Sequence, residues 1–433
     1  MGQLFLIAVR NLLTHRRRTL MLGGAIAGVT ALLLLVLGLT HGVNEMLVRS
    51  ATTVMTGHLN VGGFYKVTSG SSAPVVTDYK NVEAIIRKEI PEVAAVVNRG
   101  RGFARVISDS GSQLLVLSGI DIDDERGFRE TVSLKEGRFE DLAKRDAILL
   151  FENQAEKLGV RVGDRMTLSA PTPRGVNNTL DVQVVAIARS IGLMSTFMGF
   201  LNNEGLRSLY QLNDRTTGAL QIYLQDINQV DAVKPRLREV LSGAGFKLMD
   251  EDPRSYWMKF EAVNREGWTG QKLDVTTWKD ETSFMSWTLK LLNALSFFLI
   301  FVLLVIISVG VMNALWIAIR ERTREVGTLR AIGMQRTRVL AMFVIEGFVL
   351  GLSGTTLGAA VGLVVAALLN AVHLSVPVTV QLFVMSDTLR LAVVPAGVVG
   401  SIALITFCTT FISLFPSFLA ARMKPITAMH HIG

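Results

Sequence analysis

The chain lacks the residues on which most catalytic and metal sites depend. Its single cysteine, Cys408, lies within an apolar run, so no internal disulfide can hold an external domain together. No Gly-x-x-x-x-Gly-Lys-Ser/Thr sequence occurs, so the chain contains no P-loop. The 6 histidines lack the spacing of zinc ligands, and a Gly-x-Ser-x-Gly nucleophile elbow is absent. We therefore expect a non-catalytic chain without a metal or cofactor of its own.

Charged residues are also scarce, at 18% of the sequence, whereas 50% of the residues are hydrophobic. The mean hydropathy of +0.41 is too high for a soluble protein of this length, although the charge that remains requires a sizeable soluble part. Much of the formal charge of +8 lies beside the apolar runs, where membrane topology explains it better than nucleic-acid binding does. We predict a membrane protein that binds no nucleic acid.

Four apolar runs are long enough to cross a bilayer, at residues 19–40, 285–319, 339–372 and 389–420. The first run could be mistaken for a signal peptide, but it is longer than a usual signal core and lacks an Ala-x-Ala-like site near its end. The flanking segments are basic at 1–18, 320–338 and 421–433, whereas 373–388 carries no Lys or Arg. By the positive-inside rule, both termini are cytoplasmic and 1–18 forms an interfacial helix.

Residues 41–284 contain no stretch that is apolar enough to span. Runs with strand-like alternation come in clusters between helical patterns, which favours an α+β domain over a doubly wound sheet. We predict a large α+β domain between the first and second spanning helices, on the far side of the membrane, with helical stalks leading into it. The segment 170–178 is expected to connect two strands as a hairpin loop.

The basic segment Ile317–Arg338 lies between two apolar runs. Val326, Leu329 and Gly333, with Ile332 and Met334 close by, fall near helical spacing, and charges cover the other face. An amphipathic helix over 320–338 could carry force between a soluble partner and the membrane. The alternative is a basic anchor that only fixes topology.

Small residues four apart predict close helix packing, either within one subunit or between two. They are Gly24, Gly28, Gly347, Gly351, Gly354 and Gly358. Glu346 is costly near the inner end of the third run. It could handle protons or couple motion, but we favour pairing with a basic group or polar backbone at the membrane edge.

Several motifs in order resemble one family. Arg320–Gly333 resembles the loop of the FtsX-like permease domain in MacB, LolC and LolE transporters. Leu6–Thr19 is similar to that family's N-terminal signature, and Phe415–Ala428 is similar to its ending. Leu134–Phe139, followed by Glu156–Asp164, resembles its periplasmic domain.

The resemblance implies an ABC transporter permease that works by mechanotransmission in the bacterial inner membrane. ATP and Mg would bind a separate cytoplasmic ATPase, and a second permease subunit would complete a homodimer or a LolC/LolE-like heterodimer. The family's ATPase-coupling contacts carry over to Glu325, Thr328, Leu329, Arg330, Ala331 and Gly333.

Among family members, the resemblance favours the LolC/LolE type, which extracts lipoproteins from membrane lipid and passes them to a periplasmic carrier. The carrier or adaptor would contact the loop residues Pro171, Thr172, Pro173, Arg174 and Gly175. One alternative is a MacB-like efflux permease with a separate ATPase, an adaptor and an outer-membrane duct. A second alternative is an FtsX-like signalling scaffold that regulates a cell-wall hydrolase.

Overall fold

The computed structural model describes residues 2–14, 16–68, 70–190, 192–373 and 388–422. These residues form two compact units. The helical unit consists of the described residues within Met1–Glu45, Leu289–Ser375 and Thr388–Gly433, and the sheet domain is Met46–Thr288. The predicted loop 373–388 and tail 421–433 lie largely outside the described residues.

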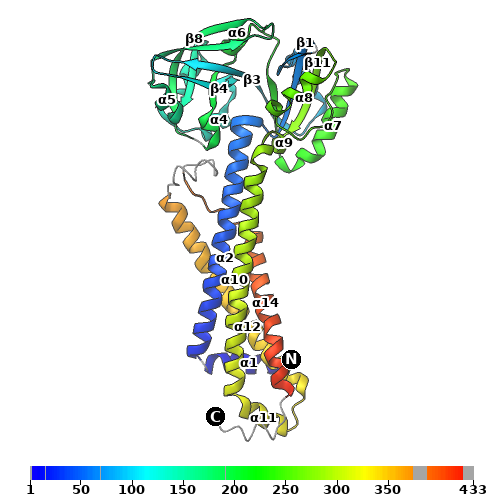
Figure 1. The fold of residues 1–433 in the computed structure, drawn as a ribbon. Coiled ribbons are helices and arrows are strands. Elements are labelled where there is room, and N and C mark those ends of the chain that lie inside the picture. Colours follow the sequence, from blue (N-terminus) through cyan, green and yellow to red (C-terminus); the bar gives the residue numbers. More distant parts are fainter. Residues whose placement is uncertain (1, 15, 69, 191, 374–387, 423–433) are drawn as a thin grey trace. The chain divides into compact units, whose positions relative to one another are not determined.

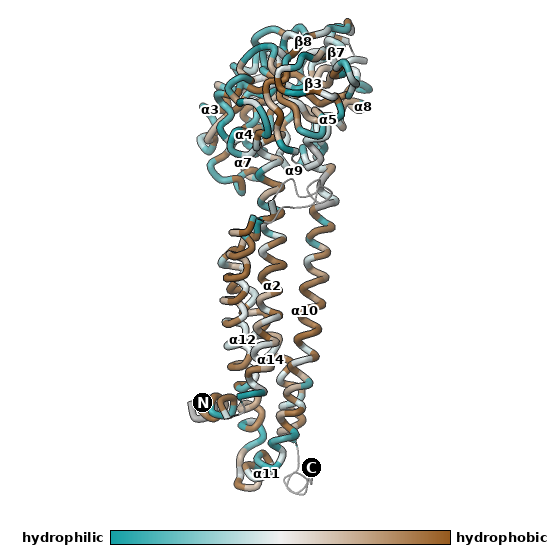
Figure 2. Tube along the Cα trace, turned by 90° about the vertical axis from the view of Figure 1, so that its left-hand side faces the viewer, coloured by the Kyte–Doolittle hydropathy of each residue, from teal (hydrophilic) through white to brown (hydrophobic). Residues whose placement is uncertain are grey.

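Four helices among the described residues are long and apolar enough to cross a membrane. They are α2 (Arg16–Ala51), α10 (Ser286–Glu321), α12 (Arg336–Val372) and α14 (Pro395–Arg422), and they form the hydrophobic helices of Figure 2. The predicted fold class, four such helices with an α+β domain after the first, is confirmed.

The helices extend past the apolar runs. α2 continues to Ala51 rather than ending at residue 40, because polar side chains end an apolar run without interrupting backbone hydrogen bonds. α2 and α10 contain 36 residues each. At a rise of about 1.5 Å per residue, each is roughly 54 Å long, against a hydrocarbon core of roughly 30 Å.

In the helical unit, α2 and α10 run side by side (Figure 1), and the hydroxyls of Thr40 and Ser296 share a hydrogen bond of 2.7 Å. A shared core of aliphatic side chains from α2, α10, α12 and α14 includes Ile26, Leu33, Ile307, Val311, Leu315, Leu350 and Ile405. Before α2, the short helix α1 (Gly2–Thr14) is joined to it by the Thr19 hydroxyl, which donates to Leu12 O.

The sheet domain contains one 11-stranded mixed sheet, in the order β11-β1-β10-β3-β4-β9-β6-β8-β5 with β2 and β7 at its sides. Its strands are β1 (Leu59–Thr68), β2 (Ser71–Ala73), β3 (Val93–Ile107), β4 (Ser112–Ile120), β5 (Leu134–Gly137), β6 (Ala147–Phe151), β7 (Arg165–Pro171), β8 (Asn177–Ala188), β9 (Met198–Asn202), β10 (Ala219–Leu224) and β11 (Gly270–Thr277). Its α-helices are α3 (Tyr79–Glu89), α4 (Arg126–Thr131), α5 (Glu152–Leu158), α6 (Asn203–Tyr210), α7 (Val230–Gly243), α8 (Phe260–Arg265) and α9 (Trp278–Glu281).

The long strand β3 belongs to two parts of this sheet. Residues 93–99 pair with β10, and residues 100–107 pair with β4. Each part has its own hydrophobic core: α3 and α7 cover β1 and β10 in one, and α5 and α6 lie in the core around β4, β6 and β8 in the other. We call the point between Arg99 and Gly100, where β3 changes partner, the seam.

Candidate functional site

The segment 320–338, predicted to be a cytoplasmic coupling helix, contains a helix of nine residues, α11 (Thr323–Ala331). α10 ends at Glu321, and Arg322 leaves the helical region with φ −104° and ψ 15°. The chain then turns through Gly333, whose φ of +107° is a conformation that favours glycine. Met334 N donates to Leu329 O at 3.0 Å across this turn. The predicted single helix was therefore too long, because the backbone reverses at Gly333.

The inner face of α11 packs on the ends of three long helices. Val326 is 2% exposed and belongs to a cluster with Ile319 of α10, Val339 and Phe343 of α12, and Ala420 of α14. Burial of these apolar side chains fixes α11 against the helix ends. A displacement of α11 must therefore move the helices on which it packs.

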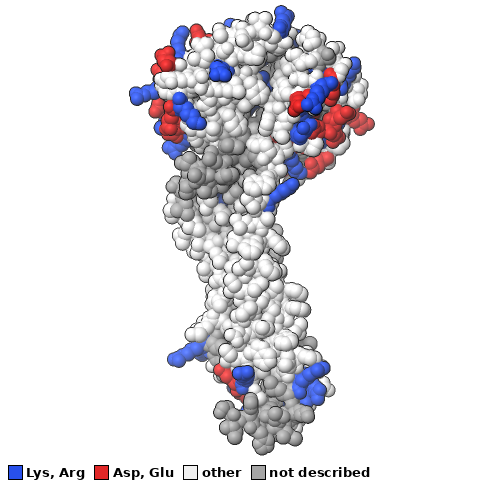
Figure 3. Space-filling model, in the orientation of Figure 1, with Lys and Arg blue, Asp and Glu red and all other residues white. Residues whose placement is uncertain are grey.

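The outer face carries the exposed residues Glu325, Thr328, Ala331 and Gly333, four of the six predicted coupling residues. Beside them lies Ile332, which is 81% exposed, the highest value among the large hydrophobic side chains that the structure describes. Sequence reasoning placed Ile332 near the buried face and so missed it. In Figure 3, charged side chains of the helical unit gather near the end that carries α11. An apolar residue within a charged surface is typical of a docking point.

The other two predicted coupling residues, Leu329 and Arg330, are half-buried. Arg330 Nη1 donates to Ala421 O at 3.3 Å, at the end of α14. A guanidinium in this position satisfies a carbonyl that the helix leaves free and complements the negative end of the helix dipole. Arg330 thus holds α11 to α14 within the chain.

A buried ion pair fixes the joint between α10 and α11. Arg322 Nη1 lies 3.0 Å from Glu346 Oε2, and the two side chains are 5% and 6% exposed. Arg322 Nη2 also donates to Asn11 O of α1 at 3.4 Å. The prediction that Glu346 pairs with a basic group is confirmed. Its partner could not be chosen from the sequence, because Arg322 is one of six arginines within Ile317–Arg338.

The predicted partner loop is the turn of the β7–β8 hairpin. Thr172 N donates to Val176 O at 2.9 Å, and Gly175 N donates to Thr172 O at 2.8 Å. Pro171 pairs with Asn177 at the end of β7, and Thr172 is 5% exposed, so Thr172 cannot contact a carrier as expected. Arg174 and Gly175 are exposed, and Pro173 is half-buried. Val176, which is 62% exposed, is the apolar tip that the sequence reading omitted.

Comparison with known proteins places these elements in one family. The model of the MacB-like periplasmic core domain matches residues 19–240, and the model of the FtsX-like permease C-terminal domain matches residues 297–425. The chain belongs to the MacB/FtsX-like permease family. The first match covers most of the sheet domain, and the second covers α11 with α12 and α14.

Curated relatives of this permease include proteins named macrolide export ATP-binding/permease protein MacB. The relative from Nitrosomonas europaea is 34% identical over 121 residues, 28% of this chain and 16% of that protein. The relative from Nitrobacter winogradskyi is 36% identical over 125 residues, 28% of this chain and 17% of that protein. The matched region thus spans less than a fifth of these relatives.

Two solved structures are also similar to the permease. The periplasmic region of MacB from Actinobacillus actinomycetemcomitans has a TM-score of 0.33 and 10% identity, covering 53% of this chain and 94% of that one. The extracellular domain of the noncanonic ABC-type transporter YknZ from Gram-positive bacteria has a TM-score of 0.31 and 15% identity, covering 43% and 96%. Family membership rests on the two sequence models.

The predicted packing glycines of the permease fall into two groups. A Cβ on the α12 glycines would meet neighbouring helices closely: on Gly347 (Ser413 Cβ, 2.8 Å), Gly351 (Thr409 Cβ, 3.3 Å), Gly354 (Ile26 Cβ, 2.9 Å) and Gly358 (Ala27 Cα, 2.7 Å). α12 therefore packs closely on α14 through the first two and on α2 through the last two. A Cβ on Gly24 or Gly28 would meet no atom of the described chain within 4 Å. A role of these two in packing stays a prediction.

Proposed function

We propose that this permease is the membrane subunit of an ABC transporter and that α11 binds a cytoplasmic ATPase. The observation that carries the proposal is Ile332, an exposed isoleucine beside the charged outer face of a short helix. Covering such a side chain contributes roughly 1.5–3 kcal/mol. ATP and Mg²⁺ would bind the ATPase, because no P-loop occurs in this sequence.

The contacts beneath α11 support a mechanical role. Arg322 and Glu346 fix the α10–α11 joint, Arg330 holds α11 to α14, and Val326 lies in a core shared by three helices. An element with this many buried contacts moves as a body with the helix ends, which mechanotransmission requires. In this proposal the membrane is the bacterial inner membrane, both termini are cytoplasmic and the sheet domain is periplasmic.

For the substrate, the names of the curated relatives favour an efflux permease that works with an adaptor and an outer-membrane duct. Extraction of lipoproteins, as in LolC/LolE-type permeases, is the second candidate. It is supported by the exposed aromatic residues of α10, because Phe297, Phe298 and Phe301 are 73%, 59% and 57% exposed and could contact an acyl chain. Replacing these phenylalanines with alanine would remove that contact without burying a polar group.

The test is purification of the full chain from native membranes with mass spectrometry of proteins and acylated peptides. Two matched variants place a charge on an exposed apolar residue: Ile332→Asp at α11 and Val176→Asp at the hairpin tip. We expect Ile332→Asp to lose the ATPase while retaining the periplasmic partner, and Val176→Asp to do the opposite.

The companion proteins decide the substrate. Adaptor and duct proteins without acylated cargo indicate efflux, and triacylated lipoproteins with a second permease and a carrier indicate extraction. A bound cell-wall hydrolase with no cargo indicates a signalling scaffold. Absence of any ATPase from the wild-type complex, or its retention by Ile332→Asp, contradicts the assignment of α11.

A further inference from the structure

The outer end of α2 fits into a set of side chains from β3 and β10. After Ala51 the helix widens into one π-helical turn, Thr52–Thr56, which ends at Gly57. Four successive backbone carbonyls there accept hydrogen bonds from side chains: Thr52 O from Tyr223 Oη (3.0 Å), Thr53 O from Arg99 Nη2 (3.1 Å), Val54 O from Arg99 Nη1 (3.2 Å) and Met55 O from Gln221 Nε2. A helix end leaves four such carbonyls without helical partners. Thr52 O also accepts from Gly57 N at 2.7 Å, whereas the carbonyls of Thr53, Val54 and Met55 are bound by the sheet side chains, and Thr56 O accepts from Asn60 Nδ2 of β1 at 3.4 Å.

Arg99 is the centre of this arrangement and is 1% exposed. Its charge is balanced by Glu125, with Nε to Oε1 at 2.5 Å and Nη2 to Oε2 at 2.8 Å. The rings of Phe128 and Phe200 lie 5.6 and 5.9 Å from the guanidinium. Burying an ion pair is rarely worthwhile for stability alone, because desolvation offsets the attraction. Because Arg99 also donates to the carbonyls of Thr53 and Val54, the pair fixes the position of the end of α2.

Arg101 lies two residues further along β3, on the same face of the strand. Its Nη2 lies 3.4 Å from Glu281 Oε1, and its guanidinium lies 4.0 Å from the centroid of the Tyr256 ring. Burial raises the pKa of Tyr256 to about 12, so the ring stays neutral beneath the cation. Glu281 ends α9, a few residues before α10 begins at Ser286. Arg101 thus holds the segment that leads into α10.

Both arginines lie at the seam of the sheet. Arg99 is the last residue paired with β10, and Arg101 already pairs with Ser118 of β4. Between them is Gly100, where a Cβ would lie 3.1 Å from Gly119 Cα, so the two strands approach closely. A cavity of about 50 Å³, lined by both arginines, Met198 and Trp257 among others, lies beside the seam. That volume is large enough to hold water, which needs about 10–15 Å³.

We propose that Arg99 and Arg101 form a two-point joint, by which β3 holds the outer end of α2 and the segment before α10. Movement of these two chain segments then changes the angle between the two parts of the sheet at the seam. Both arginines are positioning residues. The inference rests on the proposed function only for its driving force, ATP hydrolysis by a partner.

The joint itself is tested by hydrogen exchange of the full-length protein in lipid nanodiscs. The variant Arg99→Met/Glu125→Leu removes both charges together, so no isolated charge is left buried and the domain can fold. We expect backbone amides of residues 50–57 to exchange ten- to a hundredfold faster, while residues 278–288 are unchanged. Arg101→Met should give the reverse pattern. Arg99→Lys should lie between, because an ammonium cannot reproduce the planar fork.

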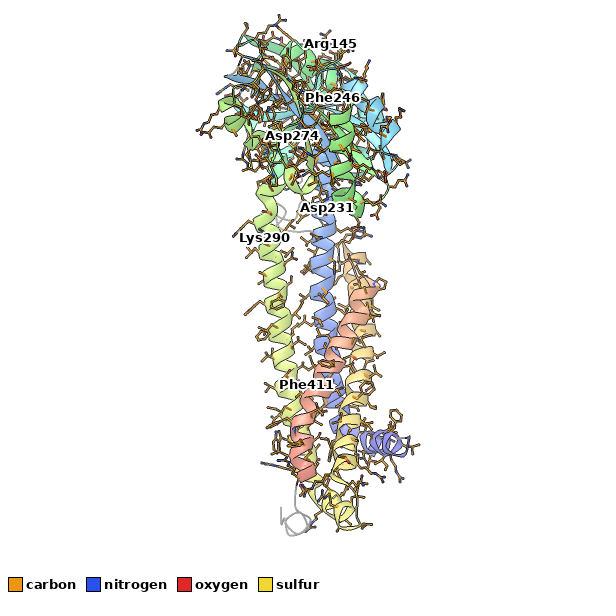
Figure 4. The ribbon with its side chains drawn as sticks, turned by 90° about the vertical axis from the view of Figure 1, so that its right-hand side faces the viewer. Arg145, Asp231, Phe246, Asp274, Lys290 and Phe411 are labelled. Carbon is orange, nitrogen blue, oxygen red and sulfur yellow. The ribbon has the colours of Figure 1, made fainter. Side chains whose placement is uncertain are left out.

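The matched control is Lys259→Met/Asp274→Leu. It removes another ion pair in the same domain, with side chains 1% and 5% exposed, between the residue before α8 and β11 rather than at the end of α2 (Figure 4 labels Asp274). It should leave the exchange of residues 50–57 unchanged. Wild-type exchange of residues 50–57 in the Arg99→Met/Glu125→Leu variant, or equal acceleration in the control, would overturn the joint.

Movement at the seam is tested with spin labels on Arg145→Cys, just before β6, and Asp231→Cys, on α7, so that one label accompanies each part of the sheet, in a Cys408→Ser background (Figure 4). With the native ATPase bound, ATP and vanadate should shift the distance between the labels, and Arg99→Met/Glu125→Leu should abolish the shift while ATP is still hydrolysed. A shift that persists in this variant, or no shift in the otherwise unaltered permease, refutes the coupling. If no ATPase copurifies, the proposed function fails, and the exchange data still decide the joint.

Discussion

The ion pair between Arg322 and Glu346 allows a quantitative test of how the α10–α11 joint is held. The side chain of Arg322 is 5% exposed and donates to both carboxylate oxygens of Glu346, at 3.0 and 3.4 Å. Arg322→Met removes these bonds and leaves a carboxylate buried without its arginine. Removing one member of a buried pair costs about 3–5 kcal/mol. We expect Arg322→Met and Glu346→Leu each to destabilise the helical unit by about 3 kcal/mol.

The double variant discriminates between a coupled pair and two independent side chains. With both charges removed, the site becomes apolar, so we expect the double variant to cost no more than either single change. The coupling free energy is then about 3 kcal/mol, at the upper end of values for residues in contact. If the losses add instead, the pair does not hold the joint.

The measurement is unfolding of the full chain in mixed micelles, followed by fluorine NMR of labelled tryptophan. Trp316 lies in the last two turns of α10, before Arg322, and its resonance is assigned with Trp316→Phe. The control is the exposed pair Arg265 and Glu261, whose side chains are both 78% exposed. Pairs of this kind contribute less than about 0.5 kcal/mol, so removing either member should leave the transition unchanged.

Three further changes follow from the contacts. Gly358→Val should destabilise the α2–α12 contact by about 1–3 kcal/mol in the same unfolding assay, because a Cβ would lie 2.7 Å from Ala27 Cα. Gly28→Val should leave the stability of that contact nearly unchanged. It should act only on association with a second subunit, which is measured by crosslinking. Burial lowers the pKa of His58, whose Nδ1 accepts from Leu224 N at 3.0 Å, so the unfolded chain binds the proton more readily than the folded one. The stability of the sheet domain should therefore fall as the pH drops below about 6.5. A melting temperature of the wild type that does not change with pH, or a pH dependence that persists in His58→Gln, would argue against this. Asn203→Ala should cost about 1–3 kcal/mol in thermal unfolding, because Asn203 is 2% exposed, its Oδ1 accepts from Gly100 N, and its Nδ2 donates to Asn98 O and Asp121 Oδ2. A change below about 0.5 kcal/mol would show that water replaces the amide.

The helical unit was readable from the sequence, and the pairing of the sheet was not. Each spanning helix is a long apolar run, a local signal, so the predicted four runs correspond to α2, α10, α12 and α14. The sheet depends on contacts between distant segments, such as the parallel pairing of Val116 in β4 with Met198 in β9. Periodicity within a strand does not say which strand lies beside it.

Sequence analysis missed some functional residues for the same physical reason, because their roles depend on contacts between distant segments. Arg99, Arg101 and Arg105 alternate along one face of β3 and look equivalent in the sequence. Only the fold shows that Arg99 is buried under α2, Arg101 is held by Glu281, and Arg105 is exposed. Likewise, an isoleucine near helical spacing predicts burial, but the turn at Gly333 directs Ile332 into solvent.

A long helix transmits displacement only if neither of its ends slips. In this permease, arginine contacts meet that condition at separate places: Arg322 at the end of α10 beside α11, Arg101 at the segment before α10, and Arg99 at the end of α2 within the sheet domain. Loss of any one should therefore give the same phenotype, ATP hydrolysis that continues without transport. Because a helix that already slips at one end delivers no motion to the other, combining Arg322→Met with Arg99→Met/Glu125→Leu should reduce transport no further than either alone. Losses that multiply, measured as transport per ATP hydrolysed, would mean that the two sites act on separate steps and that α2 and α10 do not form one mechanical path.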